Sequence, residues 1–360
     1  MSTPSSTLAL VQRFPGIRSL AHVSLGCWPT PVRAAPELAP DGGLRSLTIK
    51  CDDVSGLAYG GNKVRKLEFL LGQALEERRR SVVTFGATGS NHVRATAIYG
   101  AQLGLRVHAV LSPQPDNAYW RSNWQAVRDA GAVLHMVDSY SQALSFGTEL
   151  RQSLTVKEGV EPLVIPFGGS NARGTIGFIN AAFELAGQIA AGLLPEPDCI
   201  YLPFGSTGTA AGLAAGVRAA GLKTQVMPAR VTDLLVCNAC VTASAANAVC
   251  DLLHSLEPGF PRIRFRPREM NVLHGFVGPG YAIETPQSRQ AARLLREIEG
   301  IDLEGTYTAK AFHAMLAMKE ELELSRRVVL FWHTRPAINV AVPDDWRERL
   351  PESCRRYVSY

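Results

Sequence analysis

The chain has 360 residues, and 37 basic against 32 acidic side chains give a formal net charge of +5. Apolar residues make up 46% and charged residues 19%, which excludes an intrinsically disordered chain and allows a large buried core. The small basic excess lies in short clusters, so no nucleic-acid partner is expected. No run of 18 apolar residues occurs, so we expect neither a membrane-spanning helix nor a membrane partner.

The cysteines and the first residues bear on the compartment. Seven cysteines, an odd number, are scattered over the chain, which favours reduced thiols over a disulfide framework. The opening MSTPSSTLALVQRFPG lacks a basic segment followed by a sustained apolar stretch, so it does not resemble a secretory signal. These features predict a cytoplasmic protein.

Four residues have a spacing that could be read as a zinc site: Cys237, Cys240, Cys250 and His254. The segment 232–256 around them is rich in alanine, valine and leucine and has a helical pattern. We therefore interpret these cysteines as small core residues, and we predict no bound metal.

Strand and helix signals alternate from residue 81 onward. Short apolar, β-rich runs end at turns, and helical stretches follow them. The strands are expected at 81–85, 105–111, 132–137, 163–166, 199–204 and 328–332, and the helices at 91–103, 120–130, 175–191 and 210–220. This alternation predicts an α/β protein in which βαβ units form open, twisted, mostly parallel sheets covered by helices on both faces.

The turn at 60–62, Gly-Gly-Asn, precedes Lys63 at the start of a further predicted helix. Adjacent glycines allow the backbone to approach a ligand closely. A lysine held there can act as a Schiff-base amine if it is desolvated or lies near cations such as Arg65 and Lys66. The alternative is a basic first turn that faces water. Because helix N-termini disfavour cations, three of them at one helix start require an anion to explain them.

The turn at 86–92 also lies between a predicted strand and a predicted helix. Ser90 and Asn91 are good N-cap residues, and the simplest interpretation is a capped helix. Alternatively, the free N–H groups at this helix start bind an anion such as a substrate carboxylate. His92 is either a base or a first-turn residue that faces solvent or a neighbour.

Two later turns, at 167–171 and 204–209, combine glycines with hydroxyl residues. Hydroxyls and glycine amides at a helix start form a phosphate cradle, yet the second turn matches neither the P-loop nor the dinucleotide-binding fingerprint. Taken together, the four turns suggest one phosphate, one carboxylate and one reactive lysine. A pyridoxal-phosphate enzyme needs this combination.

The segment Gly60–Glu68 resembles the cofactor-lysine motif of the 1-aminocyclopropane-1-carboxylate deaminase and D-cysteine desulfhydrase family. Further matches occur in the family's order over nearly the whole chain: Arg13-Phe-Pro, Pro29-Thr-Pro31, Ser90-Asn91-His92, Gly169–Asn171, Ser206–Gly212, Gly280-Tyr281, and Gly300-Ile301 through Tyr307-Thr308-Ala-Lys310. The resemblance implies a two-domain fold like the tryptophan synthase β-subunit, known as fold type II. It implies a large domain at 1–62 and 180–360, a smaller inserted α/β domain at 63–179, and a homodimer.

The resemblance also implies roles for single residues. Lys63 would carry pyridoxal 5′-phosphate. Asn91 would contact the ring hydroxyl of the cofactor, while Ser90, in the same loop as His92, would hold the substrate carboxylate. The residues that would bind the phosphate or flank the ring and the reacting carbon are Lys66, Gly205, Ser206, Thr207, Gly208, Thr209, Tyr281 and Tyr307.

Two positions separate the activities of the family. The deaminases have a glutamate after the second tyrosine and a leucine after the late histidine, whereas this chain has Thr308 and Thr334, as in the desulfhydrases. A carboxylate near the pyridine nitrogen keeps it protonated and makes the ring a strong electron sink, and a hydroxyl leaves a weaker one. The weaker sink suffices when a good β-leaving group departs at once.

The resemblance thus implies α,β-elimination from a small β-substituted amino acid, as in D-cysteine desulfhydrase, giving pyruvate, ammonia and the leaving group. The rivals are elimination from an anionic substrate such as cysteate, β-replacement, cyclopropane opening and a non-catalytic carrier of the cofactor. Two departures from the family concern the substrate: the run 282–286 after the first tyrosine differs from the family's, and Arg335-Pro336 follows Thr334 where desulfhydrases have two glycines. Since Pro336 restricts the residue before it, Arg335 either binds an anionic group of the substrate or points outward into a salt bridge.

Overall fold

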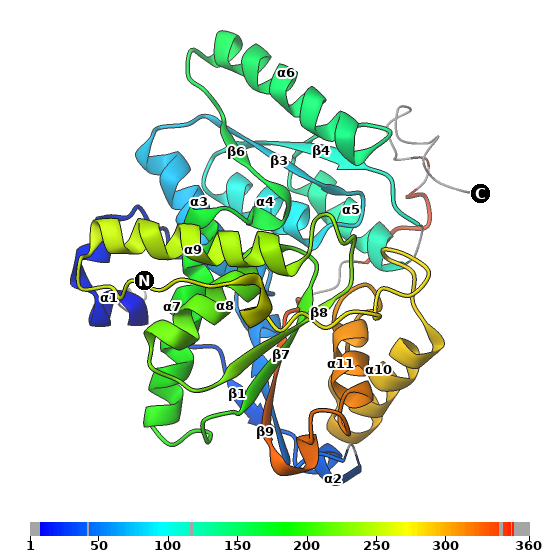
Figure 1. Ribbon diagram of the computed structural model, residues 1–360. Helices are drawn as coiled ribbons and strands as arrows, with labels where there is room; N and C mark the ends of the chain where they lie inside the picture. The colour runs from blue at the N-terminus through cyan, green and yellow to red at the C-terminus, as the bar shows by residue number, and fades with distance from the viewer. Residues whose placement is uncertain (1–7, 42, 116–117, 338–340, 347, 349–360) are drawn as a thin grey trace.

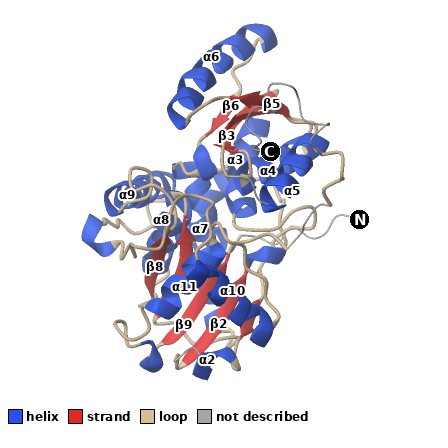
Figure 2. Ribbon diagram, turned by 90° about the vertical axis from the view of Figure 1, so that its right-hand side faces the viewer, coloured by secondary structure: helices blue, strands red, loops and turns tan. Residues whose placement is uncertain are grey.

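The computed structural model describes residues 8–41, 43–115, 118–337, 341–346 and 348. Its strands form two separate sheets, placed one above the other in Figures 1 and 2, and helices pack around both. Every strand pair but one is parallel. The α/β class with mostly parallel sheets is therefore confirmed.

The larger sheet has the strand order β1-β2-β9-β7-β8. Its edge strand β1 (Val32–Ala34) pairs antiparallel with β2 (Ser46–Cys51). The others, β9 (Val328–His333), β7 (Cys199–Phe204) and β8 (Gln225–Arg230), are parallel to β2 and to one another. The central strands are buried along almost their whole length, which explains their continuous apolar sequences.

The smaller sheet has the order β5-β4-β3-β6, and every pair in it is parallel. These strands are β5 (Val133–Met136), β4 (Arg106–Ser112), β3 (Ser81–Ala87) and β6 (Leu163–Ile165). The sequence predicts all four, with ends that agree to within two residues. In Figure 2, α6 lies on one side of this sheet and α3, α4 and α5 lie on the other.

The helices within the described ranges are α1 (Ala9–Arg13), α2 (Leu38–Asp41), α3 (Lys63–Glu76), α4 (Asn91–Gln102), α5 (Ala118–Asp129), α6 (Tyr140–Glu158), α7 (Ala172–Ala190), α8 (Thr207–Ala219), α9 (Ala239–Leu256), α10 (Pro286–Glu299) and α11 (Thr308–Ala317). Two of them, α7 and α8, approach closely because α8 has glycine at the contact. A Cβ at Gly212 would lie 2.6 Å from Cβ of Phe178, and one at Gly216 would lie 2.6 Å from Cβ of Ala182.

The predicted domain boundary follows the division of strands between the sheets only in part. All strands of the smaller sheet lie between residues 81 and 165, inside the predicted insert 63–179. The boundary between 179 and 180, however, falls within α7, which is a continuous helix. A seam between two folding units is expected in a connecting segment rather than inside a packed helix, so the exact division stays a prediction.

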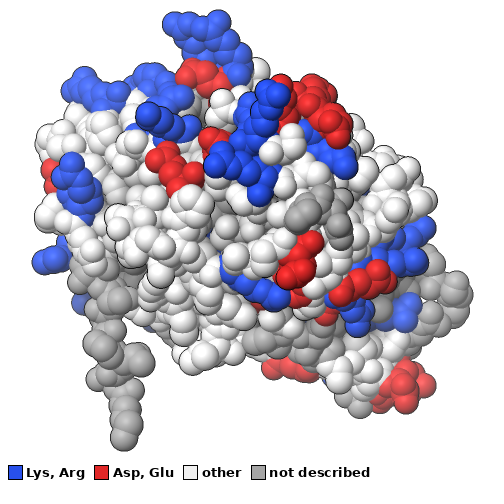
Figure 3. Space-filling model, turned by 90° about the horizontal axis from the view of Figure 1, so that it is seen from below, with Lys and Arg blue, Asp and Glu red and all other residues white. Residues whose placement is uncertain are grey.

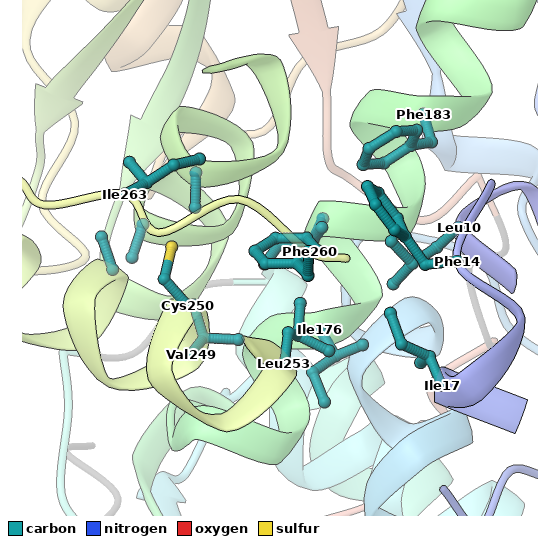
Figure 4. Packing of buried hydrophobic residues seen from close by; sticks show 14 of the residues in the cluster. Leu10, Phe14, Ile17, Ile176, Phe183, Val249, Cys250, Leu253, Phe260 and Ile263 are labelled. Carbon is teal, nitrogen blue, oxygen red and sulfur yellow. The ribbon is translucent and has the colours of Figure 1, made fainter. Parts of the chain in front are cut away.

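The N-terminal segment is held by a hydrophobic cluster between α1, α7 and α9 (Figure 4). The ring of Phe14 packs edge-on against Phe183 and Phe260, with ring centroids 5.7 and 5.2 Å apart. Cys250 belongs to this cluster and Cys237 to a neighbouring one, as the sequence predicts. Cys240 is exposed, so its assignment to the core is wrong.

The described part of the chain can be compared with what a charged binding surface, a metal site and a membrane span would each require. On the face shown in Figure 3, basic and acidic side chains occur in interspersed groups. Within the described residues, no three His, Cys, Asp or Glu side chains come together as a metal site would require. None of the helices in those same ranges is long and apolar enough to cross a membrane.

A buried group of charges connects β2, α3 and α7. Arg65 of α3 donates to both carboxylate oxygens of Asp52, at 2.7 and 2.9 Å, and to Glu184 of α7, at 2.9 and 3.0 Å. Lys50 of β2 donates to the same Glu184 at 2.6 Å. Burial alone would raise the pKa of Glu184, but Arg65 and Lys50 lower it to about 2. The anion that Arg65 requires is therefore supplied by the protein itself.

Glu184→Gln should destabilise the fold by about 3–5 kcal/mol, because it leaves two buried cations with a single carboxylate between them. The denaturant midpoint of unfolding measures the loss. Glu269→Gln is the matched control, since the ion pair of Glu269 with Arg218, at 2.9 Å, is partly exposed and exposed pairs contribute little to stability. Equal small losses in both variants would show that the buried charges do not stabilise the fold.

Candidate cofactor and substrate site

A cavity of about 400 Å³ opens where the strands of both sheets end. Its wall includes residues at the carboxyl ends of β3, β4, β7 and β9 and at the starts of α3 and α4. In open α/β sheets, ligands bind at this edge, because the loops and helix N-termini converge there. The cavity therefore gathers the glycine-rich turns that the sequence analysis singles out.

Lys63 is the first residue of α3, and its side chain lines the cavity. Its Nζ donates to Oδ1 of Asn62 at 3.0 Å, and it makes no ion pair with any described residue. Desolvation lowers the pKa of Lys63 to about 8. About a tenth of this amine is thus neutral, and therefore nucleophilic, at pH 7, far more than for an ordinary lysine.

Lys66 lies one turn further along α3 and is fully buried. Its Nζ donates to neutral groups only, the carbonyl of Gly168 at 3.0 Å and the hydroxyl of Ser170 at 3.2 Å. Burial, reinforced by Lys63, lowers the pKa of Lys66. A buried amine without a carboxylate in the described part of the chain is suited to an anionic ligand.

The start of α8 completes this anion cradle. Ser206 is the N-cap but its side chain makes no capping bond, and the N–H of Gly208 donates to the hydroxyl of Ser170 at 3.1 Å. A Cβ at Gly208 would lie 2.9 Å from Nζ of Lys66, and one at Gly205 would lie 2.6 Å from the ring of Tyr307. Glycine at these two positions allows Lys66 and Tyr307 to approach the backbone closely, and the buried amine, the hydroxyls and the helix start together fit a phosphate group.

The cradle is connected to the turn that carries Lys63. Nδ2 of Asn62 donates to the hydroxyl of Thr209 at 3.2 Å. Gly205, Ser206 and Thr209 line the cavity itself, whereas Thr207 and Gly208 are buried in the first turn of α8 behind it. The start of α8 and the turn that carries Lys63 are therefore neighbours at the cavity, with Lys66 behind the wall.

Asn91 is held in one orientation by three donors. Its Oδ1 accepts from the hydroxyls of Tyr59 and Tyr119, at 2.9 and 2.7 Å, and from Nδ2 of Asn123, at 2.8 Å. This saturates the acceptor and leaves Nδ2 of Asn91 available as a donor at the cavity wall. Asn91 is thus suited to contact an oxygen such as the ring hydroxyl of the cofactor.

The neighbours of Asn91 also reach the cavity. Ser90 is the N-cap of α4, and its hydroxyl accepts from the N–H of Val93 at 3.4 Å. His92 is buried, and its Nε2 lies 3.0 Å from the hydroxyl of Thr84. Burial lowers the pKa of His92 well below its usual range, and the nearby positive charge of Lys63 lowers it further. His92 therefore faces a protein neighbour as a neutral ring, and its low pKa makes it a weak base.

Tyr281 and Tyr307 lie on the cavity wall and share a short hydrogen bond between their hydroxyls. Burial raises the pKa of both phenols, to about 12 for Tyr281. Glu304 lies beside them on the wall, and its oxygens accept from the N–H groups of Thr306, Tyr307 and Thr308 at 2.7–2.8 Å. Glu304 thus holds the start of α11, which positions Tyr307.

Thr308 and Thr334, the two residues that distinguish activities within the family, differ in their position relative to the cavity. Thr334 lines the cavity directly after β9, next to Arg335. Thr308 does not line it. Thr308 is fully buried, and its hydroxyl accepts from the N–H of Glu304 at 2.9 Å. The structure therefore gives Thr308 a role in the turn before α11 and does not bring it to the predicted cofactor contact.

Several residues of the site are not predicted from the sequence. Glu304 could have been found as an acid just before a helix, three residues ahead of Tyr307, a pattern typical of helix capping. Ser170 lies in a turn that the sequence marks, but nothing in its local sequence indicates that it bridges Lys66 and Gly208. Tyr59 and Asn123 contact Asn91 across long sequence separations, so no local signal points to them.

Comparison with known proteins also indicates a pyridoxal-phosphate enzyme. A model of the family described as pyridoxal-phosphate dependent enzyme matches residues 23–334. The chain is 35% identical to nocardicin C-9′ epimerase of Nocardia uniformis subsp. tsuyamanensis, over 88% of this chain and 93% of that protein. It is 31% identical to D-cysteine desulfhydrase of Klebsiella pneumoniae (strain 342), over 91% of this chain and 96% of that protein.

Among solved structures, an ACC deaminase homologue superposes with a TM-score of 0.77 at 29% identity and covers 89% of this chain and 93% of that one. A fungal L-serine ammonia-lyase from Rhizomucor miehei, at 18% identity and a TM-score of 0.59, shares the fold. The resemblance noted in the sequence is thus confirmed. The chain belongs to the family of pyridoxal-phosphate-dependent enzymes, within the group of the 1-aminocyclopropane-1-carboxylate deaminases and D-cysteine desulfhydrases.

Proposed function

We propose that this enzyme catalyses α,β-elimination on a small β-substituted amino acid, releasing pyruvate, ammonia and the β-substituent. The observation that carries the proposal is the amine of Lys63, which faces the cavity without an ion-pair partner among the described residues and has its pKa lowered to about 8. The presence of Thr334 on the same wall and the 31% identity to a D-cysteine desulfhydrase support elimination over cyclopropane opening.

Different residues in and around the cavity would bind the cofactor and the substrate. Pyridoxal phosphate, when attached at Lys63, supplies an electron sink that makes the α-proton of an amino acid acidic. Lys66, the hydroxyl of Ser170 and the start of α8 would hold the phosphate. Nδ2 of Asn91 would donate to the ring hydroxyl. Ser90 and the N–H groups at the start of α4 would bind the substrate carboxylate.

Lys63, Tyr281 and Tyr307 have pKa values suited to proton transfer in this reaction. A general base works best when its pKa lies near the working pH, and Lys63 meets this condition on the cavity wall. The hydroxyls of Tyr281 and Tyr307, whose pKa values burial raises, stay protonated and can donate to the leaving group.

Epimerisation at Cα is a second candidate. Two observations favour it: the 35% identity to nocardicin C-9′ epimerase and the bonded phenol pair of Tyr281 and Tyr307, which could return a proton to Cα. Both reactions begin with removal of the α-proton. They differ in whether a β-substituent then leaves or a proton comes back.

The two reactions are separated by a panel of D- and L-β-substituted amino acids, including cysteine and β-chloroalanine, assayed in D2O. Elimination predicts pyruvate and ammonia in equal amounts from at least one of them, and no 2-oxobutyrate from 1-aminocyclopropane-1-carboxylate. Inversion at Cα with deuterium uptake but no pyruvate would assign epimerisation instead. Efficient formation of 2-oxobutyrate would show that Thr334 does not exclude deaminase activity.

The lowered pKa of Lys63 predicts how cofactor-free protein reacts with pyridoxal phosphate. Only the neutral amine attacks, so attachment should accelerate as pH rises and reach half its limiting rate near pH 8, against about 10.4 for an ordinary lysine. The growth of visible absorbance gives the rate, and borohydride followed by peptide mass spectrometry gives the site. Nα-acetyl-lysine, whose side-chain amine is free, is the control in the same series. A midpoint near 10, or labelling elsewhere, contradicts the assignment.

Lys66→Met should weaken retention of pyridoxal phosphate while leaving Lys63 able to react. Loss of one hydrogen bond to a charged group corresponds to about 1.5–3 kcal/mol, or roughly a 10- to 150-fold increase in Kd. Equilibrium dialysis measures the change. Lys223→Met is the matched control, because Lys223 is exposed on a loop far along the chain. Unchanged retention in Lys66→Met would place the phosphate elsewhere.

A further inference from the structure

We propose that Arg335 forms a second anion-binding subsite in the cavity, which selects amino acids whose side chain ends in a carboxylate or sulfonate. This inference rests on the proposed function in one respect, namely that the substrate is an amino acid. It does not depend on whether elimination or epimerisation follows.

The backbone around Arg335 is fixed against the turn that carries Lys63. The carbonyl of Thr334 accepts from the N–H of Asn62 at 3.3 Å, and the N–H of Ala337 donates to the carbonyl of Asp53 at 3.1 Å. A Cβ at Gly61 would lie 3.2 Å from Cδ of Pro336, so the two segments are in close contact. Arg335 therefore extends from a frame that is held on both sides.

The guanidinium of Arg335 lacks the partners that arginine normally has. It lines the cavity, and its Nε is buried without a hydrogen-bond partner. Within the described ranges its contact is with the ring of Tyr119, whose centroid lies 6.0 Å from Cζ. The outward salt bridge considered from the sequence is not formed there. Because an unsatisfied buried donor destabilises a protein, this geometry suits an incoming acceptor.

The acidic residues of the cavity wall do not satisfy Arg335. Both oxygens of Glu304 are taken by backbone N–H groups at the start of α11. Asp233 is exposed, and its Oδ1 accepts from the N–H of Leu235 at 2.7 Å. Burial raises the pKa of the Glu304 carboxyl, and Arg335 is close enough to lower it in part. Neither carboxylate forms a hydrogen bond or ion pair with Arg335 within the described ranges, so its N–H donors remain available to a ligand.

The position of Arg335 separates it from the phosphate cradle. Its neighbour Tyr119 donates to Oδ1 of Asn91 at 2.7 Å, which places Arg335 on the Asn91 side of the cavity. The cradle is built from other residues, since Lys66 and the N–H of Gly208 both donate to the hydroxyl of Ser170. A planar guanidinium binds carboxylates and sulfonates through two parallel N–H donors. Since the start of α4 offers donors for the α-carboxylate, Arg335 is left for a second acidic group.

The test compares acids with their isosteric amides. Visible-absorbance changes of the holoenzyme give Kd values for D- and L-aspartate against asparagine and for glutamate against glutamine, and this readout needs no turnover. The wild type should bind at least one acid tenfold or more tightly than its amide. Arg335→Gln should abolish that preference and change amide binding less than threefold, while Arg335→Lys should retain part of it.

Arg230→Gln is the matched control, because Arg230 is also half-buried at the end of a parallel strand, but it donates to the carbonyl of Thr232 at 2.7 Å. It should leave the preference intact. Equal weakening of acid and amide in Arg335→Gln would assign Arg335 to the α-carboxylate and overturn the proposal. No preference in the wild type, or a preference that survives Arg335→Gln and Arg335→Lys, would overturn it as well. Acid preference without pyruvate from any substrate would instead reject elimination and keep the subsite.

Discussion

The arrangement of the site depends on how three cations at the start of α3 are divided. Residues three apart on a helix share a face, whereas a residue two positions away points elsewhere. Lys63 accordingly lines the cavity, Lys66 is buried behind the wall against Gly168 and Ser170, and Arg65 turns inward to Asp52 and Glu184. The buried carboxylates neutralise only the arginine. The two lysines are left without anions among the described residues, at a helix end that already disfavours positive charge.

Lys63 and Lys66 lie in the same turn of α3, but their surroundings give them different chemical roles. Lys66 donates to two neutral acceptors beside the start of α8, which leaves one N–H donor of its ammonium group for a phosphate, and it does not line the cavity where a carbonyl would react. Lys63 has a single bond, to Asn62, and a pKa lowered to about 8, so it can react with a carbonyl group. The ion network that fixes Arg65 also joins β2 to α7, and thereby keeps both amines at the edge where the two sheets meet.

Local patterns predict much of the fold and only part of the site. The strand 199–204 agrees residue for residue with β7, because a buried parallel strand is a continuous apolar run between turn signals. The helix α6 is not anticipated, since its surface is largely exposed and its polar sequence has little periodicity. The strand β8 contains Pro228, which argues against a strand in sequence but is tolerated here because β8 is an edge strand of the larger sheet.

Long-range partners explain why the rest could not be predicted. The bond from Arg65 to Glu184 spans 119 residues and the one from Tyr119 to Asn91 spans 28, so neither the burial of Arg65 nor the orientation of Asn91 follows from local sequence. The role expected for Thr308 rests on its place next to Tyr307, yet adjacent residues at a helix start point in different directions. Thr334, at the end of a parallel strand, does reach the cavity.

The central claim is that Lys63 and Lys66 hold the two ends of one cofactor molecule. A crystal structure of the protein purified with pyridoxal phosphate tests this most directly. We predict continuous electron density from Nζ of Lys63 to the ring, with the phosphate between Nζ of Lys66, the hydroxyl of Ser170 and the first turn of α8. Density attached to another lysine, or a phosphate bound away from Lys66, would contradict the account.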